Sequence, residues 1–263
     1  MSIPEPQPNR AFEWTQAPWG AALRCTPLAE IAPHYFTVGN LGLRNAAGEW
    51  HAVAEGLRVS TGALRLIRQV HGASVATARN GTTSPWETPE ADAIVSNDPH
   101  VAIGVRVADC APVLLADRKR AAVGAVHAGW RGAVQSIVSE AVRAMQREFG
   151  SDPGDLVAAI GPCLGPCCGE VGEEVVQAFQ EAGHSVAALE RWFSPGPQGR
   201  PMLDLWSANV DQLAAAGVLR ENIHAAELCT KTHAAIMHSY RASGKAAGRM
   251  LAAIRPSTFS LHP

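Results

Sequence analysis

The stretch CAPVLLADRKRAAVGAVHAG, Cys110–Gly129, decides the fold that we predict. Two apolar runs, PVLLAD and AAVGAV, flank the charged residues RKR. Two strands joined by a polar turn have this pattern, so it predicts an antiparallel β-hairpin. With a two-residue turn at 118–119, Cys110 would face His127. Directly opposed side chains have Cβ atoms about 4.5 to 5.5 Å apart, so this pair could bind one metal ion.

A long helix is predicted after the hairpin, because apolar residues recur every three or four positions from Val134 to Phe149 and Gly150 can end the helix. Further elements are expected as helices over 173–182, 203–216 and 229–240, as strands over 64–75 with a break at 71–72, 101–107 and 157–160, and as loops over 80–90 and 195–201. Strands and helices alternate irregularly. This favours an α/β or α+β sandwich, with a mixed β-sheet and flanking helices.

Composition limits the class of protein. The chain has 263 residues, of which 47% are hydrophobic, and this content is enough for one large core. We expect a flexible, proline-rich lead-in over 1–20 and a single domain over 21–263. The net charge of -2, from 22 Lys+Arg and 24 Asp+Glu, does not suit binding to a nucleic acid polymer.

The expected location and assembly follow from what the sequence lacks. It contains no uninterrupted apolar run of about 18 residues, so a membrane span is not expected. It shows no export signal, so a cytoplasmic protein is expected, as a monomer or weak homo-oligomer. Its six cysteines are scattered irregularly, which favours thiols, metal ligands or nucleophiles over a disulfide framework.

A third metal ligand is suggested by His71. It lies in QVHG at the end of a predicted strand, and this setting is similar to that of His127 in VHAG. Together with Cys110, two histidines and one cysteine suit a zinc ion that keeps a fourth position open for water. From spacing alone, buried structural histidines and a buried thiol are the alternative.

Trp130 and Arg131 follow His127 at the start of the predicted helix. Free backbone N–H groups and the helix dipole favour anions at such a position, and Arg131 would add a positive charge. We therefore expect an anionic group of the substrate there. The alternative is that Trp130 belongs to the core and Arg131 is a solvated cap.

The segment GPCLGPCCGE holds three further cysteines. Cys163, Cys167 and Cys168 are not followed closely by a second cysteine pair or by a histidine, as structural zinc sites usually require. We interpret them as small buried side chains in a segment that Gly and Pro kink.

Short motifs carry a resemblance to a known family. In order, they are QVHG (Gln69–Gly72), ADAIVSN (Ala91–Asn97), ADCAPVLLAD (Ala108–Asp117), HAGWRG (His127–Gly132), GPCLGPCCGEV (Gly161–Val171), LDLWSAN (Leu203–Asn209), CT (Cys229–Thr230), SYR (Ser239–Arg241) and GRM (Gly248–Met250). The chain resembles the YfiH-type proteins. That family is also described as laccase-domain or multicopper polyphenol oxidases, purine nucleoside phosphorylases and peptidoglycan editing factors.

The resemblance implies an α/β sandwich with metal ligands at His71, Cys110 and His127. It also implies an enzyme that splits adenosine, inosine and methylthioadenosine with phosphate and that deaminates adenosine. Residues expected to act in catalysis are Cys110, His127, Arg131 and Arg241, and residues expected to bind substrate are Asn40, Gln69 and Trp130. Zinc is expected rather than copper, because multicopper oxidation needs more histidine ligands than one such cluster supplies.

Other functions stay open at this point. Without metal, Cys110 could act as nucleophile and His127 as base, in a hydrolase that edits peptidoglycan precursors. A copper-dependent polyphenol oxidase and a binding module without catalysis are further alternatives. Metal content and the products formed from adenosine would separate these classes.

Overall fold

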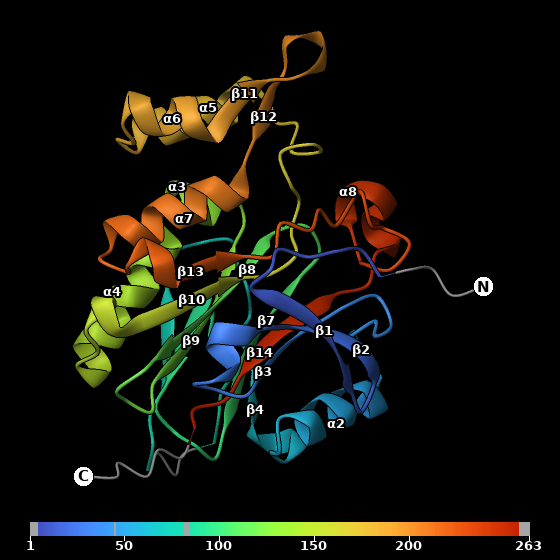
Figure 1. Ribbon diagram of the computed structural model, residues 1–263, viewed down its shortest axis with the longest axis vertical. Helices are drawn as coiled ribbons and strands as arrows, with labels where there is room; N and C mark the ends of the chain where they lie inside the picture. Colours follow the sequence, from blue (N-terminus) through green and yellow to red (C-terminus); the bar gives the residue numbers. More distant parts are fainter. Residues whose placement is uncertain (1–4, 45, 82–84, 258–263) are drawn as a thin grey trace.

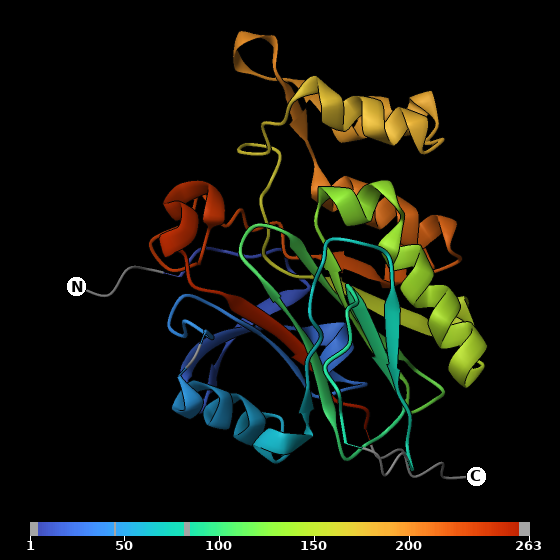
Figure 2. The ribbon, with the colours of Figure 1, turned by 180° about the vertical axis from the view of Figure 1, so that it is seen from behind.

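Two six-stranded sheets face each other at the centre of the protein (Figure 1). They are seen in a computed structural model that describes residues 5–44, 46–81 and 85–257. Helix α2 (Ala47–Gly56) covers the outer face of one sheet. Helices α4 (Ile137–Phe149) and α7 (Leu205–Ala215) cover the outer face of the other (Figure 2). The described chain is therefore a sandwich of mixed sheets with flanking helices, as predicted from the sequence.

The strands come from distant parts of the sequence. The first sheet contains, in spatial order, β1 (Phe12–Ala17), β2 (Gly20–Cys25), β3 (His34–Thr37), β14 (Met250–Ile254), β7 (Ala102–Val107) and β4 (Leu64–Arg65). The second contains β13 (Ile223–Ala225), β10 (Leu156–Ile160), β8 (Ala111–Asp117), β9 (Val123–Ala128), β6 (Ala93–Ser96) and β5 (Val75–Ala78). A small hairpin is made of β11 (Phe193–Pro195) and β12 (Pro201–Leu203).

The other helices are short. They are α1 (Thr26–Ala29), α3 (Trp130–Val134), α5 (Glu173–Glu181), α6 (Val186–Trp192) and α8 (Tyr240–Ser243), with 3₁₀ turns η1 (Thr61–Ala63), η2 (Pro153–Asp155), η3 (Pro197–Gly199), η4 (Arg220–Asn222) and η5 (Gly244–Ala246). Helices α5 and α6 lie with the β11–β12 hairpin beyond α7, farther from the sheets (Figures 1 and 2). No helix of the described residues is long and apolar enough to cross a membrane.

Strand β8 shows why the two cores form. Val113 and Leu115 pack into the core beneath the helices, whereas Leu114 and Ala116 pack into the core between the sheets. This follows from the two-residue period of a strand, which points successive side chains to opposite faces. Every residue of β8 is buried, so its sequence is a continuous apolar run rather than an alternating one.

The predicted β8–β9 hairpin is confirmed, but its predicted register is wrong. The Asp117 carboxylate accepts hydrogen bonds from the N–H groups of Lys119 (2.8 Å) and Arg120 (3.1 Å) and organises a longer loop. As a result His127 pairs with Pro112 rather than with Cys110. The register differs from the predicted one by two positions. A shift of two leaves side chains on the same face, so Cys110 and His127 stay close.

Other expectations for local structure were partly wrong. The helix expected from Val134 is split, because Ser136 has a left-handed φ of 54° between α3 and α4, although Gly150 ends α4 as predicted. The expected strand over 64–75 ends after Arg65, and the expected helix over 229–240 is a series of turns. Strand β1 (Phe12–Ala17) lies within the range 1–20 that was expected to be a lead-in without regular structure. The loop expected over 80–90 lies partly outside the described residues, at 82–84.

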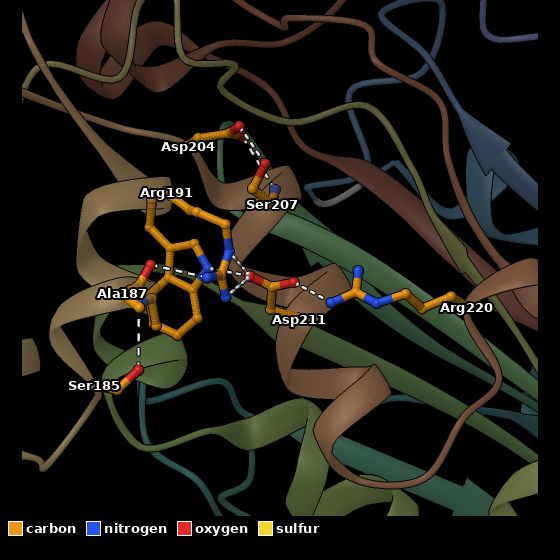
Figure 3. A network of polar contacts seen from close by, with 9 residues as sticks. Ser185, Ala187, Arg191, Asp204, Ser207, Asp211 and Arg220 are labelled. Carbon is orange, nitrogen blue, oxygen red and sulfur yellow. Dashed lines mark hydrogen bonds and ion pairs between the residues drawn. The ribbon is translucent and has the colours of Figure 1, made fainter.

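Asp211 on α7 joins three segments of the helical layer (Figure 3). Its Oδ2 accepts hydrogen bonds from Arg191 Nη2 (2.8 Å) and from the Trp192 indole (2.9 Å), and its Oδ1 accepts one from Arg220 Nη2 (2.7 Å). Burial opposes this charge, but the donors outweigh it and lower the pKa of Asp211. The carboxylate therefore ties α6 and η4 to α7.

Candidate functional site

His71, Cys110 and His127 meet at one end of the second sheet. Cys110 directly precedes β8, His127 lies near the end of the antiparallel strand β9, and His71 lies in the loop between β4 and β5. One ligand atom of each residue lies within 4.8 Å of the other two. The two imidazole rings are 4.8 Å apart between centroids and nearly perpendicular, at 80°. The structure thus brings together the three residues that the sequence suggested as metal ligands.

Asp92 orients both histidines. Its side chain is fully buried, and its Oδ1 accepts a hydrogen bond from His127 Nδ1 (2.8 Å), which leaves His127 Nε2 as the ligand atom. The same carboxylate accepts hydrogen bonds from the N–H groups of Val70 (3.2 Å), His71 (2.9 Å) and Gly72 (2.6 Å). These bonds hold His71 at a left-handed φ of 60°. Carboxylates that orient ligand histidines in this way are usual in metal sites.

The charges of this group favour a deprotonated thiol. Burial opposes ionisation of Cys110, but hydrogen bonds with His127 and His71 outweigh it and lower its pKa to about 6. Burial likewise opposes a charge on His127, but the hydrogen bonds with Asp92 and Cys110 raise its pKa to about 9. The donors on Asp92 outweigh its burial and lower its pKa. A thiolate is the form that binds metal ions and attacks electrophiles.

Gly129 leaves room for the sulfur atom. A Cβ atom built on this residue would lie 2.7 Å from Cys110 Sγ and 3.5 Å from His71 Cδ2. Real Cβ atoms do not approach sulfur so closely, so a larger residue would displace the thiol. The glycine after VHA is therefore explained by contact with the ligand cluster.

Asp109 places Cys110 at the wall of a cavity. Its φ of 94° is strained for a residue with a side chain. Its Oδ1 accepts a hydrogen bond from Thr230 Oγ1 (2.6 Å), and its Oδ2 accepts one from the N–H group of Arg241 (2.5 Å). Its carbonyl oxygen accepts a bond from the N–H group of Leu164 (2.8 Å). Three distant segments are thus joined beside Cys110.

The cavity has a volume of about 840 Å³ and includes the three candidate ligands in its wall. Among the described residues that line the cavity, one is acidic, Asp109, and six are arginines. The arginines are Arg44, Arg68, Arg106, Arg131, Arg241 and Arg249. Apolar contacts come from Val107, Leu164, Val171, Leu203 and Leu205. Pockets for small molecules have this size and this mixture of apolar and polar groups. The excess of positive charge suits an anionic ligand.

Two of these arginines are braced by neighbouring groups. The guanidinium carbon of Arg131 lies 4.2 Å from the centre of the Trp130 ring. The Nη1 atom of Arg241 donates hydrogen bonds to the carbonyl oxygens of Cys168 (3.2 Å) and Glu170 (2.9 Å). The guanidinium groups of Arg131 and Arg241 are thus held at the cavity wall. At a third lining residue, Arg106, burial and then the charge of Arg249 lower the pKa of the side chain.

The cavity is lined by all four residues expected to act in catalysis, Cys110, His127, Arg131 and Arg241, and by Gln69 and Trp130, which were expected to bind substrate. Gln69 also exchanges two hydrogen bonds with the backbone of Arg106, of 2.7 and 2.9 Å. Asn40 is not a lining residue. Its amide donates hydrogen bonds to the carbonyl oxygens of Trp19 and Ala21, both of 3.1 Å, and its expected role in substrate binding stays a prediction.

Sequence reasoning missed several residues of this site. Asp92 and Asp109 lie in motifs that carried the family resemblance, but without a role of their own. The arginines at 44, 106 and 249 and Tyr240 also line the cavity. Of the three cysteines expected to be buried, Cys163 is buried, Cys168 is half-buried and Cys167 is exposed. The expectation was therefore wrong for Cys167 and Cys168.

Residues 44–256 match the family described as multi-copper polyphenol oxidoreductase laccase, and the chain belongs to this family. It is 39% identical over 163 residues to a purine nucleoside phosphorylase of Bacteroides thetaiotaomicron, which covers 62% of this chain and 60% of that protein. It is 36% identical over 163 residues to "adenosine deaminase RL5" of an unknown prokaryotic organism, which covers 62% and 61%. The chain thus spans about three fifths of the length of each relative.

The fold is shared with a solved YfiH protein. The crystal structure of the hypothetical protein YfiH of Bacillus licheniformis matches with a TM-score of 0.81 and 22% identity. The match covers 92% of this chain and 97% of that one. The α/β sandwich that the resemblance implied is therefore confirmed, and the family match over residues 44–256 confirms the resemblance itself.

Proposed function

We propose that this protein is a zinc-dependent purine nucleoside enzyme. It splits adenosine, inosine and methylthioadenosine with phosphate, and it also deaminates adenosine. The observation that carries the proposal is the His71–Cys110–His127 group in the wall of a cavity that six arginines line. Two relatives are named for these activities, one as a purine nucleoside phosphorylase and one as an adenosine deaminase, and this supports the same pair.

The donor set fits zinc. Two imidazoles and one thiolate match a three-ligand catalytic site, in which bonds of about 2.0 to 2.3 Å leave one tetrahedral position for substrate or water. Asp92 supplies the hydrogen bond that such sites require behind a ligand histidine. When bound, zinc acts as a Lewis acid and lowers the pKa of a water molecule that it binds. The described residues hold two groups of potential metal ligands, His71–Cys110–His127 and a group of three cysteines. Together they offer too few histidines for multicopper oxidation.

The cavity residues divide the work of phosphorolysis. In this reaction phosphate attacks the anomeric carbon of the ribose, and the bond to the purine breaks. Arg131 and Arg241 would hold the phosphate, because both guanidinium groups line the cavity and are braced. Trp130 and the apolar lining residues offer a surface for the purine. Gln69, paired with the Arg106 backbone, would position the wall of the cavity.

The products formed from adenosine test this proposal. The purified protein, loaded with zinc, is incubated with adenosine with and without phosphate. We expect adenine and ribose 1-phosphate only when phosphate is present, and inosine without phosphate. If neither adenine nor inosine forms above the background of the Cys110→Ala variant, the proposal is contradicted.

A matched set of variants tests the phosphate site. Arg131→Met and Arg241→Met are each expected to raise the KM for phosphate by at least about tenfold, since a charge-assisted hydrogen bond contributes about 1.5 to 3 kcal/mol. Arg143→Met is the control, because Arg143 lies on α4 and pairs there with Glu140. Equal effects of all three variants would contradict the assignment.

A second candidate is a metal-free cysteine hydrolase acting on an amide or ester of a peptidoglycan precursor. The specific observation in its favour is the chain Asp92–His127–Cys110, which has the order carboxylate, base and nucleophile, with the pKa of Cys110 lowered to about 6. Removal of metal separates the two candidates. Loss of activity on chelation and recovery with zinc support the first, whereas hydrolysis that survives chelation supports the second.

A further inference from the structure

Three other cysteines also gather their sulfur atoms. Cys167 and Cys168 lie in the loop after β10, and Cys229 lies after β13. One sulfur atom of each lies within 4.8 Å of the other two. The Sγ atoms of Cys167 and Cys168 are 3.7 Å apart. This group shares no residue with the His71–Cys110–His127 group, and the function proposed above gives none of its residues a role.

The spacing suits a metal ion better than a disulfide. Zinc–sulfur bonds of about 2.3 Å in a tetrahedral site place two sulfur atoms about 3.8 Å apart. The observed 3.7 Å is close to this value, whereas a disulfide needs its sulfur atoms about 2.05 Å apart. Cys167 is exposed and Cys168 half-buried, so an ion can enter from solvent.

The backbone fixes the third sulfur beside the other two. Cys163 and Cys229 form a parallel bridge, in which Cys163 N donates to Leu228 O (3.2 Å) and Thr230 N donates to Cys163 O (2.9 Å). The bridge therefore holds the segment of Cys229 against the loop that also carries Cys167 and Cys168.

A fourth donor lies in reach. The hydroxyl oxygen of Thr232 is 3.4 Å from Cys167 Sγ and 3.7 Å from Cys168 Sγ. It therefore stands next to the triangle of sulfur atoms, where it or a water molecule could complete four-fold coordination.

We propose that Cys167, Cys168 and Cys229 form a second metal site, which binds a thiophilic cation with a filled d shell, Zn²⁺ or Cu⁺. Three soft thiolate ligands select such ions over Mg²⁺ or Ca²⁺. On binding, each thiol that is still protonated releases its proton to solvent as its sulfur–metal bond forms. The oxidation state of the ion does not change.

The ion would brace one wall of the substrate cavity. Leu164 and Gly169 on the cysteine loop line the cavity, and the carbonyl oxygen of Cys168 accepts a hydrogen bond from Arg241. Thr230, next to Cys229, donates its hydroxyl to Asp109. The second site would therefore hold two loops together beside Arg241, and its role is structural.

Metal stoichiometry of the full-length protein tests the proposal. Reduced protein is dialysed against zinc, or anaerobically against a Cu⁺ complex, and bound metal is measured by mass spectrometry. Wild type is expected to bind one ion more per chain than Cys229→Ser and one more than Cys167→Ser. Cys163→Ser is the matched control, since Cys163 lies in the same loop outside the sulfur triangle, and it is expected to bind as much as wild type. The dialysis, with zinc or with Cu⁺, in which wild type binds one ion more than these variants identifies the ion.

Cobalt gives a readout that does not depend on activity. Cobalt bound to thiolates absorbs strongly in the near ultraviolet. A Cys110→Ala variant is expected to keep most of this absorption, because Cys167, Cys168 and Cys229 are three of the four candidate thiolates. Cys167→Ser, at an exposed position, keeps the test valid if Cys229→Ser does not fold. Unchanged stoichiometry in both variants, or a disulfide in wild type that excludes metal, would overturn the proposal.

Discussion

Replacement of Asp92 by Asn tests how the candidate metal site is held together. The two carboxylate oxygens of Asp92 accept four hydrogen bonds, one from His127 Nδ1 and three from the N–H groups of residues 70–72. An Asn side chain has one oxygen acceptor, and its NH₂ group would face either Val70 and Gly72 or His71 and His127. Two donors would therefore lose their acceptor.

The magnitude follows from these two lost bonds. A hydrogen bond to a charged group contributes about 1.5 to 3 kcal/mol, so the loss is about 3 to 6 kcal/mol as an upper value. This loss of free energy is shared between the stability of the fold and the affinity for metal. Loss of a group behind a metal ligand lowers metal affinity by about 10- to 100-fold. We expect a loss of zinc affinity in this range and a lower free energy of unfolding for the metal-free protein.

The assay is competition for zinc with a chromophoric chelator, together with urea unfolding. Asp98→Asn is the matched control, because Asp98 accepts one hydrogen bond from the N–H group of His100 (2.9 Å), and an amide oxygen can replace that acceptor. Zinc affinity of Asp92→Asn within twofold of wild type would refute the reasoning, as would an equal loss in Asp98→Asn.

Three further predictions concern packing, pH and the helical layer. Gly129→Ala places a methyl group against the sulfur of Cys110. At an overpacking cost of about 1 to 3 kcal/mol, the same zinc competition should show affinity about 5- to 140-fold weaker. Burial lowers the pKa of His34 from its ordinary 6.5 to about 4. Between these values the unfolded chain binds more protons, so unfolding free energy should fall by about 3 kcal/mol as pH falls from 6.5 to 4, and His34→Gln should remove this part of the slope in urea titrations. Asp211→Asn loses charged hydrogen bonds, so its free energy of unfolding at pH 7 should be lower than that of wild type by about 1 to 3 kcal/mol. The pKa of Asp211 is lowered in the folded protein, so the stability that its charge adds is lost as pH falls through that pKa, and the two proteins should become alike in acid.

The fold was predictable where local patterns carry the information. The apolar runs of the β8–β9 hairpin and the spacing of α4 reflect strand and helix periods, and Gly150 has the left-handed φ of 68° expected of a helix end. The register of the hairpin was not predictable, because it depends on how Asp117 accepts bonds from its own loop. The turns over 229–240 form because Thr230 bonds to Asp109 and to Cys163, which are distant in sequence.

The site was predictable in its ligands but not in its support. His71, Cys110 and His127 have the chemistry of metal ligands, so residue type and context suggest them. Asp92 acts through bonds to a backbone segment about 20 residues away, and no short pattern records such contacts. The hydrogen bonds of the Asn40 amide to the turn between β1 and β2 were likewise not predictable, because they join segments about 20 residues apart.

The central claim is that His71, Cys110 and His127 bind one cation at the substrate cavity. Zinc K-edge X-ray absorption of Cys229→Ser, loaded with one equivalent of zinc, tests it most directly, because this variant lacks the third sulfur of the other cysteine group. We expect one sulfur neighbour at about 2.3 Å and at least two nitrogen neighbours at about 2.0 to 2.1 Å. A zinc shell without sulfur, or with more than one sulfur and no imidazole nitrogen, would contradict the account.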